Sequence, residues 1–487
     1  MAVGEPGRVR RMTLDLERPL RHPDLQSEPL MSKRARWLVI LGFVLPGTAQ
    51  LVAGNRKLGR FGLIATTVLV VGALAAGLGF LFARVATLTI FTNSAVLLLV
   101  QWALFIYAVI WVALGIDTLR LTKLVRVQRN WRVPVAMLSV LLTVVPAAGA
   151  AWAGTAVGAG RNLLSDLFPS APAVEPVDGR YNILLLGTDA GADREGLRPD
   201  SISLVSVDAK TGQSVIVGLP RDMKGAPFPD DSPMQPIYPE GYCDEINNYE
   251  VVDGGGYYCF TTGALNSLVT EVEDSGSPSY EGMYADAVSK GSTPGIEATK
   301  DAVSGVTGLD VQFYVLVNMD AFESLINALG GITIDVQERL PIGGHINEFT
   351  GELEGVDGWI EPGTQGMDGY TAQWYARSRY GSAEGDYSRM QRQRDLQAAI
   401  LAQMNPQNVL LRFQDVAAAG TELVETDIPE SMLGRFVDLA AKAREHDIVN
   451  VELVPPAIDP EAPDFDATRQ LVSDGVAAAS PAETEAG

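Results

Sequence analysis

Long apolar stretches dominate the first third of the chain, whereas the remainder alternates short apolar runs with polar ones. A helix needs about 20 apolar residues to cross the hydrocarbon core of a bilayer. Three of the four stretches have about that length, so they predict membrane-spanning helices. The first is shorter and contains Pro46, Gly47 and Gln50, which would interrupt a span. The four stretches are residues 37–54, 61–83, 95–115 and 135–154.

Basic residues flank the apolar stretches, and the cytoplasmic loops of membrane proteins are enriched in Lys and Arg. They lie on both sides of the first stretch and again between the third and the fourth, at Arg120–Arg132. We therefore expect residues 37–54 to re-enter the membrane from the cytoplasm. The three spans would leave the chain after about Gly154 outside the cell. The alternative, with four full spans, would leave it in the cytoplasm.

Composition divides the chain into five regions. Both terminal regions are polar or acidic and lack apolar periodicity, which is typical of disordered segments. A linker rich in Pro and Ala separates the membrane region from a folded domain. The expected regions are a cytoplasmic tail at 1–32, a membrane region at 33–156, a linker at 157–179, a folded domain at 180–455 and an acidic tail at 456–487.

Short strands and amphipathic helices are predicted within the folded domain. Two neighbouring strands are joined by a five-residue loop that contains Gly212, which predicts a hairpin. Helical patterns dominate from 371 to 444. We therefore predict an α/β (α+β) fold in which helices flank a mixed central sheet. The predicted strands are 181–186, 201–208, 214–220, 312–317 and 332–336, and a helix is predicted at 321–329.

The predicted hairpin would bring two charged residues close together. Folding it about its loop brings Asp200 opposite Arg221, so an acid and a base that are distant in sequence become neighbours at one end of the sheet. Asp189 leaves the first strand and would join them if that strand pairs alongside.

Charge is divided between the two parts of the chain. Residues 1–160 contain 17 Lys and Arg against 6 Asp and Glu, and the remainder contains 20 against 53. An acidic domain argues against a nucleic-acid partner. The basic part suits the cytoplasmic face of a membrane.

The chain has two cysteines, Cys243 and Cys259, both in the acidic part. They form no metal-binding spacing with the three histidines, so no zinc site is expected. If the domain lies outside the cell, a disulfide between them is expected, contributing about 3 kcal/mol. Two unpaired thiols are the alternative.

Five arginines fall within 18 residues of a domain that is otherwise poor in basic residues. Asp386 is a suitable N-cap for a helix running toward Met404, with Arg389 near its start. A cation there opposes the helix dipole by about 0.3–1 kcal/mol unless an anion is bound. Helix N-termini and guanidinium groups bind phosphate, so a phosphate site is one interpretation and a solvated charged helix the other. Arg394 is expected to be a surface charge.

Several motifs of the folded domain resemble those of the LytR–CpsA–Psr family, in its order and spacing, over about residues 180–405. The resemblance implies a phosphotransferase of cell-wall assembly that is anchored in the membrane. It would move a glycopolymer from a polyprenyl-pyrophosphate carrier to a peptidoglycan hydroxyl and form a phosphodiester. The motifs are Asn182–Asp189, Arg198–Ser201, Leu219–Met223, Tyr314–Val336 and Gly363–Gln393.

The resemblance also implies roles for individual residues. Asp189 and Asp200 match acidic positions that hold Mg²⁺ or orient the pyrophosphate, so Mg²⁺ is the expected cofactor. The arginines would stabilise charge on the phosphates. The residues expected to be catalytic are Asp189, Asp200, Arg221, Arg379 and Arg389, and those expected to bind substrate are Arg198, Arg377, Arg392 and Gln393.

The chain also departs from the family pattern. Pro199 and Ser201 flank Asp200, where the family commonly has Arg-Ser-Asp-Thr. A pyrophosphatase acting on the lipid carrier would use the same aspartates and arginines, so it is the main alternative. An envelope-related transcriptional regulator is disfavoured by the acidic domain, and a non-catalytic glycopolymer-binding module by the presence of the charged positions. The glycopolymer itself is not identified.

Overall fold

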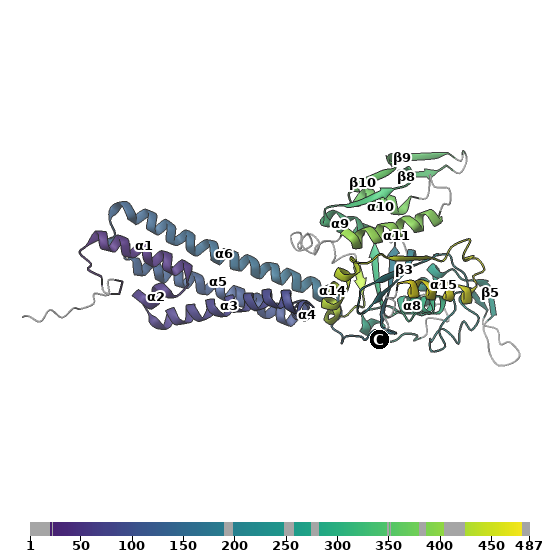
Figure 1. The fold of residues 1–487 in the computed structure, drawn as a ribbon, viewed down its shortest axis with the longest axis horizontal. Coiled ribbons are helices and arrows are strands. Elements are labelled where there is room, and N and C mark those ends of the chain that lie inside the picture. Colours follow the sequence, from purple (N-terminus) through teal and green to yellow (C-terminus); the bar gives the residue numbers. More distant parts are fainter. Residues whose placement is uncertain are drawn as a thin grey trace, which may run out of the picture. The chain divides into compact units, whose positions relative to one another are not determined.

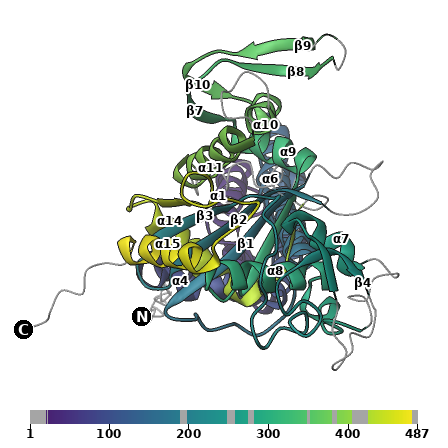
Figure 2. The same ribbon diagram turned by 90° about the vertical axis from the view of Figure 1, so that its right-hand side faces the viewer.

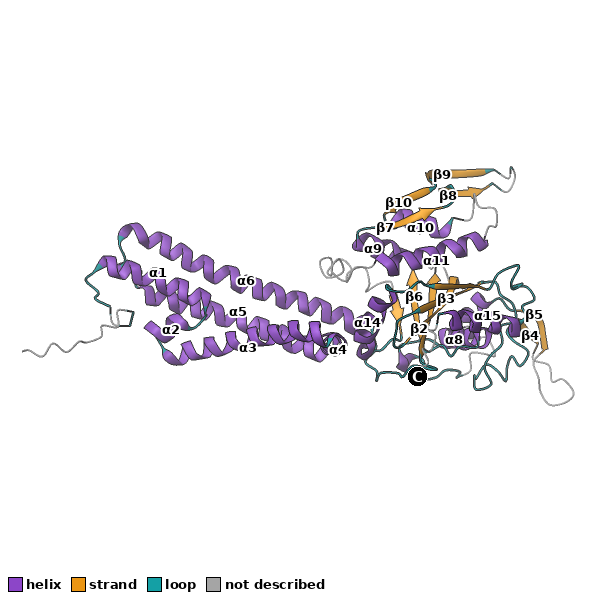
Figure 3. Ribbon diagram, viewed as in Figure 1, coloured by secondary structure: helices purple, strands orange, loops and turns teal. Residues whose placement is uncertain are grey.

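The computed structural model describes residues 20–21, 23–188, 198–247, 258–273, 282–347, 350, 352–378, 386–403 and 424–479. Two compact units are found. A helical unit comprises residues 1–82 and 98–158, and a sheet unit comprises residues 83–97 and 159–487. Figure 3 distinguishes the helices of the first from the mixed elements of the second.

Three described helices are long and apolar enough to cross a membrane. Their outer surfaces expose large apolar side chains such as Val68 and Val109, which are 67% and 70% exposed. Such a surface would be costly in water and suits a hydrocarbon environment. The helices are α3 (Arg56–Phe82), α5 (Ser94–Thr122), which continues through the 3-10 turn Leu124–Arg126, and α6 (Arg129–Leu167).

The first apolar stretch is divided into two helices, α1 (Glu28–Val44) and α2 (Thr48–Ala53). Gly47 separates them with a φ of 97°, and a Cβ there would lie 2.3 Å from the carbonyl oxygen of Gly59. Only glycine satisfies both demands without strain. The break agrees with the predicted interruption, and re-entry into the membrane stays a prediction.

Two predicted boundaries of this region are wrong. Helix α1 begins at Glu28, inside the predicted tail 1–32, because Met31 and Ala35 are fully buried against neighbouring helices. Helix α6 continues to Leu167, through much of the predicted linker 157–179. Residues 157–167 contain three leucines and no proline, so the helix can continue until Pro169.

A six-stranded mixed sheet forms the centre of the sheet unit (Figures 1 and 2). Its order is β11-β6-β1-β2-β3-β12. β1 pairs antiparallel with β2, and β2 with β3, whereas β1–β6 and β3–β12 are parallel. The predicted mixed sheet and its strands are therefore observed, with strand ends within two residues of those expected. The strands are β1 (Arg180–Thr188), β2 (Pro199–Asp208), β3 (Ser214–Leu219), β6 (Phe313–Asn318), β11 (Val424–Thr426) and β12 (Val449–Glu452).

Both faces of this sheet are covered by helices. Leu204 and Val217 pack in a cluster with side chains of α7, α8 and α15, whereas Val205 and Ile216 pack with side chains of α14. Successive strand residues point to opposite faces, so a strand buried on both sides is apolar throughout. The covering helices are α7 (Leu268–Glu273), α8 (Pro294–Thr307), α14 (Leu433–Ala443) and α15 (Phe465–Ala478).

A second layer with its own apolar cluster lies at one end of the central sheet and is seen at the top of Figure 2. Ile326, Ile334 and Leu396 are buried together in it. It consists of helices α9 (Met319–Leu329), α10 (Gly369–Arg377) and α11 (Asp386–Gln403), and of strands β7 (Ile332–Val336), β8 (Leu340–Ile346), β9 (Leu353–Ile360) and β10 (Gly363–Met367).

The predicted acidic tail 456–487 is partly wrong, because residues 465–478 form helix α15. Asp464 caps it by accepting from the backbone N–H groups of Asp466 and Ala467. Thr468 and Val472, one turn apart, are fully buried against the central sheet's cluster of helices. Tertiary burial thus orders a segment whose composition is typical of disorder.

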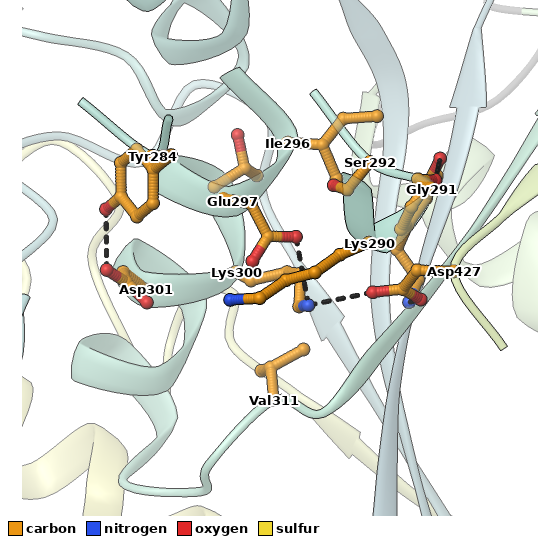
Figure 4. A network of polar contacts seen from close by, with 12 residues as sticks. Tyr284, Lys290, Gly291, Ser292, Ile296, Glu297, Lys300, Asp301, Val311 and Asp427 are labelled. Carbon is orange, nitrogen blue, oxygen red and sulfur yellow. Dashed lines mark hydrogen bonds and ion pairs between the residues drawn. The ribbon is translucent and has the colours of Figure 1, made fainter. Parts of the chain in front are cut away.

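An ionic network joins α8 to Asp427, the residue that follows strand β11 (Figure 4). Lys300 Nζ lies 3.1 Å from Glu297 Oε1 and 2.9 Å from Asp427 Oδ2. Asp427 also accepts from the backbone N–H of Tyr314 at 2.8 Å. Burial acts to lower the pKa of Lys300, but the two carboxylates prevail and raise it. The network therefore keeps an ammonium group charged in the interior.

Candidate active site

The β2–β3 hairpin brings an acid and a base together at the end of the central sheet. Ile202 pairs with Leu219, and Asp200 and Arg221 each lie two residues beyond that pair. Arg221 Nη1 donates to Asp200 Oδ1 at 2.5 Å, and the two side chains are 26% and 20% exposed. The predicted pairing is confirmed. Because both side chains are partly exposed to solvent, a charged ligand can also contact them.

Helix α11 faces this pair across a small pocket. Met390, Gln393 and Arg394 lie at i, i+3 and i+4, so they share one face of the helix. The residues that line the pocket are Asp200, Ser201, Ile202, Ser203, Gly218, Leu219, Arg221, Met390, Gln393 and Arg394. Strands β2 and β3 therefore form one wall, which we call the strand wall, and α11 forms the other, the helix wall.

Gln393 lines the pocket, and its predicted binding of substrate stays a prediction. Its side chain is 7% exposed, and its Nε2 donates to the carbonyl oxygen of Ala376 at 3.3 Å. Arg389 precedes it by one helical turn and is 3% exposed. Arg389 does not line the pocket as the structure stands, so its predicted contact with a pyrophosphate stays a prediction.

Arg392 is bonded to protein groups through all three guanidinium nitrogens. Nε donates to Tyr375 O at 3.0 Å, Nη1 to Glu338 Oε1 at 3.0 Å, and Nη2 to Ser378 O. Burial lowers its pKa, although Glu338 opposes the shift. These contacts tie α11 to the end of α10. They favour a structural role for Arg392 over the predicted substrate binding.

The expectation that Arg394 is a surface charge is wrong. Its side chain is 2% exposed, lines the pocket and forms an ion pair with Glu452, the last residue of β12. The face of α11 that carries Gln393 also carries Arg394, and packing of that face on the sheet buries both. In the sequence, the burial of Arg394 was indicated by its position directly after Gln393, a predicted site residue.

The structure describes two of the four remaining predicted site residues, Arg377 and Arg198. Arg377 ends α10, with its guanidinium carbon 5.6 Å from the ring centroid of Trp374. Arg198 is exposed just before β2. Asp189 and Arg379 lie outside the described residues, so their roles stay predictions.

The cysteine pair lies in a separate hairpin formed by β4 (Cys243–Asn247) and β5 (Tyr258–Thr262). Ile246 is the cross-strand partner of Cys259. Cys243 is 4% exposed, and the side chain of Cys259 lies outside the described part of the chain. The disulfide stays a prediction.

The pocket offers one carboxylate to a metal ion. Asp200 is the acidic residue among the described side chains that line it, and no group of three metal-ligating side chains occurs within the described ranges. Mg²⁺ commonly takes one or two protein carboxylates and completes its shell with water and substrate phosphate oxygens. Asp200 together with the predicted Asp189 would match that donor set.

Comparison with known proteins shows what the chain resembles. Residues 268–459 match the LytR_cpsA_psr family. Over 250 residues the chain is 25% identical to the polyisoprenyl-teichoic acid–peptidoglycan teichoic acid transferase TagU of Enterococcus faecalis, covering 51% of this chain and 61% of TagU. Over 281 residues it is 23% identical to biofilm regulatory protein A of Streptococcus mutans, covering 56% of this chain and 53% of that protein.

The chain is also similar to TagV of Bacillus subtilis. Over 142 residues the chain is 29% identical to TagV of Bacillus subtilis, covering 29% of this chain and 34% of TagV. The crystal structure of TagV superposes with a TM-score of 0.39 at 18% identity, over 62% of this chain and 98% of TagV. The chain thus spans about half to three fifths of the length of TagU and of biofilm regulatory protein A.

Proposed function

We propose that this chain, which matches the LytR_cpsA_psr family over residues 268–459, transfers a glycopolymer from a polyprenyl-pyrophosphate carrier to a hydroxyl group of peptidoglycan. The observation that carries the proposal is the pocket in which Asp200 and Arg221 face Gln393 and Arg394. Similarity to proteins named as teichoic acid transferases supports the reaction class.

The proposed step exchanges one P–O bond for another. The oxygen of the acceptor hydroxyl attacks the glycan-bearing phosphorus, and the bond from that phosphorus to the polyprenyl phosphate breaks. The hydroxyl proton leaves to a base, and polyprenyl phosphate departs with the bonding electrons. Such a transfer depends on positioning and on neutralising phosphate charge more than on covalent chemistry by the protein.

Arg221 would supply that neutralisation. Its guanidinium is partly exposed and is fixed by Asp200, so it can donate to phosphate oxygens without first being ordered. Asp200 has two candidate roles, as a Mg²⁺ ligand together with Asp189 or as the base that accepts the hydroxyl proton. When bound, Mg²⁺ would neutralise charge on the pyrophosphate.

We further propose that the sheet unit lies outside the cell. Helix α4 (Arg84–Thr92) connects α3 to α5 and packs on α14, and the hydroxyl of Ser94 donates to Glu430 Oε2 at 2.8 Å. The link between α3 and α5 therefore shares a side of the membrane with residues after α6. The basic segment Arg120–Arg132 lies between α5 and α6, which favours the cytoplasm for the opposite side.

The test uses the full-length chain in detergent micelles. It would be incubated with a polyprenyl-pyrophosphate-linked oligosaccharide, peptidoglycan fragments and Mg²⁺, and the products analysed by mass spectrometry. We expect a glycan phosphodiester on the fragments, dependent on Mg²⁺ and absent from the Asp200→Asn variant. Release of phosphorylated oligosaccharide without attachment would instead identify a pyrophosphatase and overturn the transfer reaction.

A further inference from the structure

Arg394 is a charged side chain in an unusual position, almost fully buried on the helix wall. A buried guanidinium is costly unless it is paired. Its partner, Glu452, ends the edge strand β12 and has a side chain that is 38% exposed. The ion pair thus joins the helix wall to the far edge of the central sheet.

Gly218 explains how the guanidinium reaches Glu452. In the parallel register of β3 and β12, Gly218 lies beside Glu452. A Cβ at Gly218 would lie 2.5 Å from Arg394 Nη1 and 3.3 Å from its Cζ. Arg394 therefore lies directly on the backbone of β3, in space that any side chain at position 218 would fill.

The contact between Arg394 and Gly218 fixes the position of the face of α11 that lines the pocket. Arg394 follows Gln393 directly and lies one turn after Met390, and all three line the pocket. Gly218 lies three residues before Arg221 on the chain that forms the strand wall. The distance between the two walls therefore depends on how closely Arg394 approaches Gly218.

We propose that Arg394 is a positioning residue. Its side chain, held between Gly218 and Glu452, sets the distance between α11 and the strand wall. The inference rests on the proposed function, because it concerns the same pocket. Because the guanidinium is paired with Glu452, Arg394 would not bind the substrate itself. It would affect the reaction by holding Gln393 in position. A displacement of about 1 Å in such a constellation can lower a rate about 100-fold.

The first test removes each of the two contacts of Arg394 without changing the sequence of α11. Glu452→Gln removes the charge partner, and Gly218→Ala fills the space under the guanidinium. Each is expected to lower kcat of the folded full-length chain about 10- to 100-fold. Because both act through Arg394, the double variant should be no slower than the worse single variant. Additive losses would overturn the proposal.

Charge exchange and a matched control complete this test. Arg394→Glu combined with Glu452→Arg should recover activity relative to Arg394→Glu alone. Glu361→Gln breaks the exposed Arg339–Glu361 pair and should leave kcat unchanged. Wild-type kcat in both Glu452→Gln and Gly218→Ala would overturn the positioning role. So would a loss of thermal stability with no change in kcat per folded molecule.

A binding measurement separates this inference from the proposed function. Inorganic pyrophosphate would be titrated calorimetrically into the full-length chain and its variants. We expect Glu452→Gln and Gly218→Ala to weaken binding about tenfold, in parallel with kcat. A wild-type chain that binds pyrophosphate but transfers no glycan would overturn the proposed function alone. Unchanged affinity together with unchanged kcat in both variants would overturn the positioning role alone.

Discussion

The two walls of the pocket are built in different ways. The strand wall comes from one hairpin, whose pairing places Asp200 and Arg221 together, with both side chains partly exposed. The helix wall comes from α11, whose arginines are buried and bonded to groups on other elements, Arg392 to the end of α10 and Arg394 to β12. We therefore propose that the strand wall presents charge to a ligand, whereas Arg392 and Arg394 hold the helix wall in position.

This difference separates two kinds of arginine within one site. A partly exposed ion pair contributes little to stability, about 0–1 kcal/mol, so the proposed binding of substrate by Arg221 would cost the fold little. A buried guanidinium that satisfies backbone carbonyls is costly to remove, because its partners are left without donors. Substitutions in the strand wall should therefore change activity, and those at Arg392 should change stability.

The largest expected effect is in the strand wall. Asp200→Asn and Arg221→Gln should each lower glycan transfer at least about 100-fold, because each removes charge from the site of phosphoryl transfer. Both should keep a near-wild-type unfolding temperature in detergent, measured by intrinsic fluorescence. Lys210→Gln, at the other end of the same hairpin, is the matched control. Transfer within threefold of wild type by both variants would remove this pair from the mechanism.

The next effect is in the helix wall. Arg392→Met should destabilise the fold by about 2–4 kcal/mol, because Tyr375 O and Ser378 O lose their donor. A large fall in the unfolding temperature is expected. Arg339→Met removes an exposed arginine paired with Glu361 and should have a small effect. If Arg392→Met stays as stable as wild type but binds pyrophosphate weakly, Arg392 binds substrate, as the sequence predicts.

The smallest expected effect is on the stability of α10, the helix to which Arg392 ties the helix wall. Asp368 caps that helix by accepting from Thr371 N–H at 2.8 Å, and the hydrogen bonds from Thr371 lower its pKa. The folded pKa lies below the unfolded value, so the stabilisation is present above about pH 4 and is lost as the pH falls. Asp368→Ala should cost about 1 kcal/mol at neutral pH and less once the carboxylate is protonated, because the neutral carboxyl group is a weaker acceptor.

Hydrogen exchange by mass spectrometry would check this prediction on peptides that cover α10. Asp368→Asn is the control, since Asn also caps helices but does not titrate. Exchange in α10 should be faster in Asp368→Ala than in wild type at pH 7, and this difference should become smaller at low pH. A difference of the same size below pH 3 would show that the charge of Asp368 adds nothing to the cap.

The sequence by itself determined the features that depend on local periodicity. Alternation and a short loop predicted the β2–β3 hairpin, and with it the contact of Asp200 with Arg221. The length of the apolar stretches predicted three helices able to cross a membrane. A helix was predicted to follow Asp386 as its N-cap, and α11 begins within one residue of that position, at Asp386 itself. In each case, the physical cause acts between residues that are close along the chain.

Only the tertiary structure decided which side of a helix or strand is covered, and by what. Strand β7 follows α9 as expected, but it pairs with β10 outside the central sheet. Arg394 is buried because β12, far along the chain, supplies Glu452 and because Gly218 leaves room above β3. Helix α15 is ordered by burial of Thr468 and Val472. Such contacts join distant segments, and the free energy that selects them comes from packing, which no local pattern records.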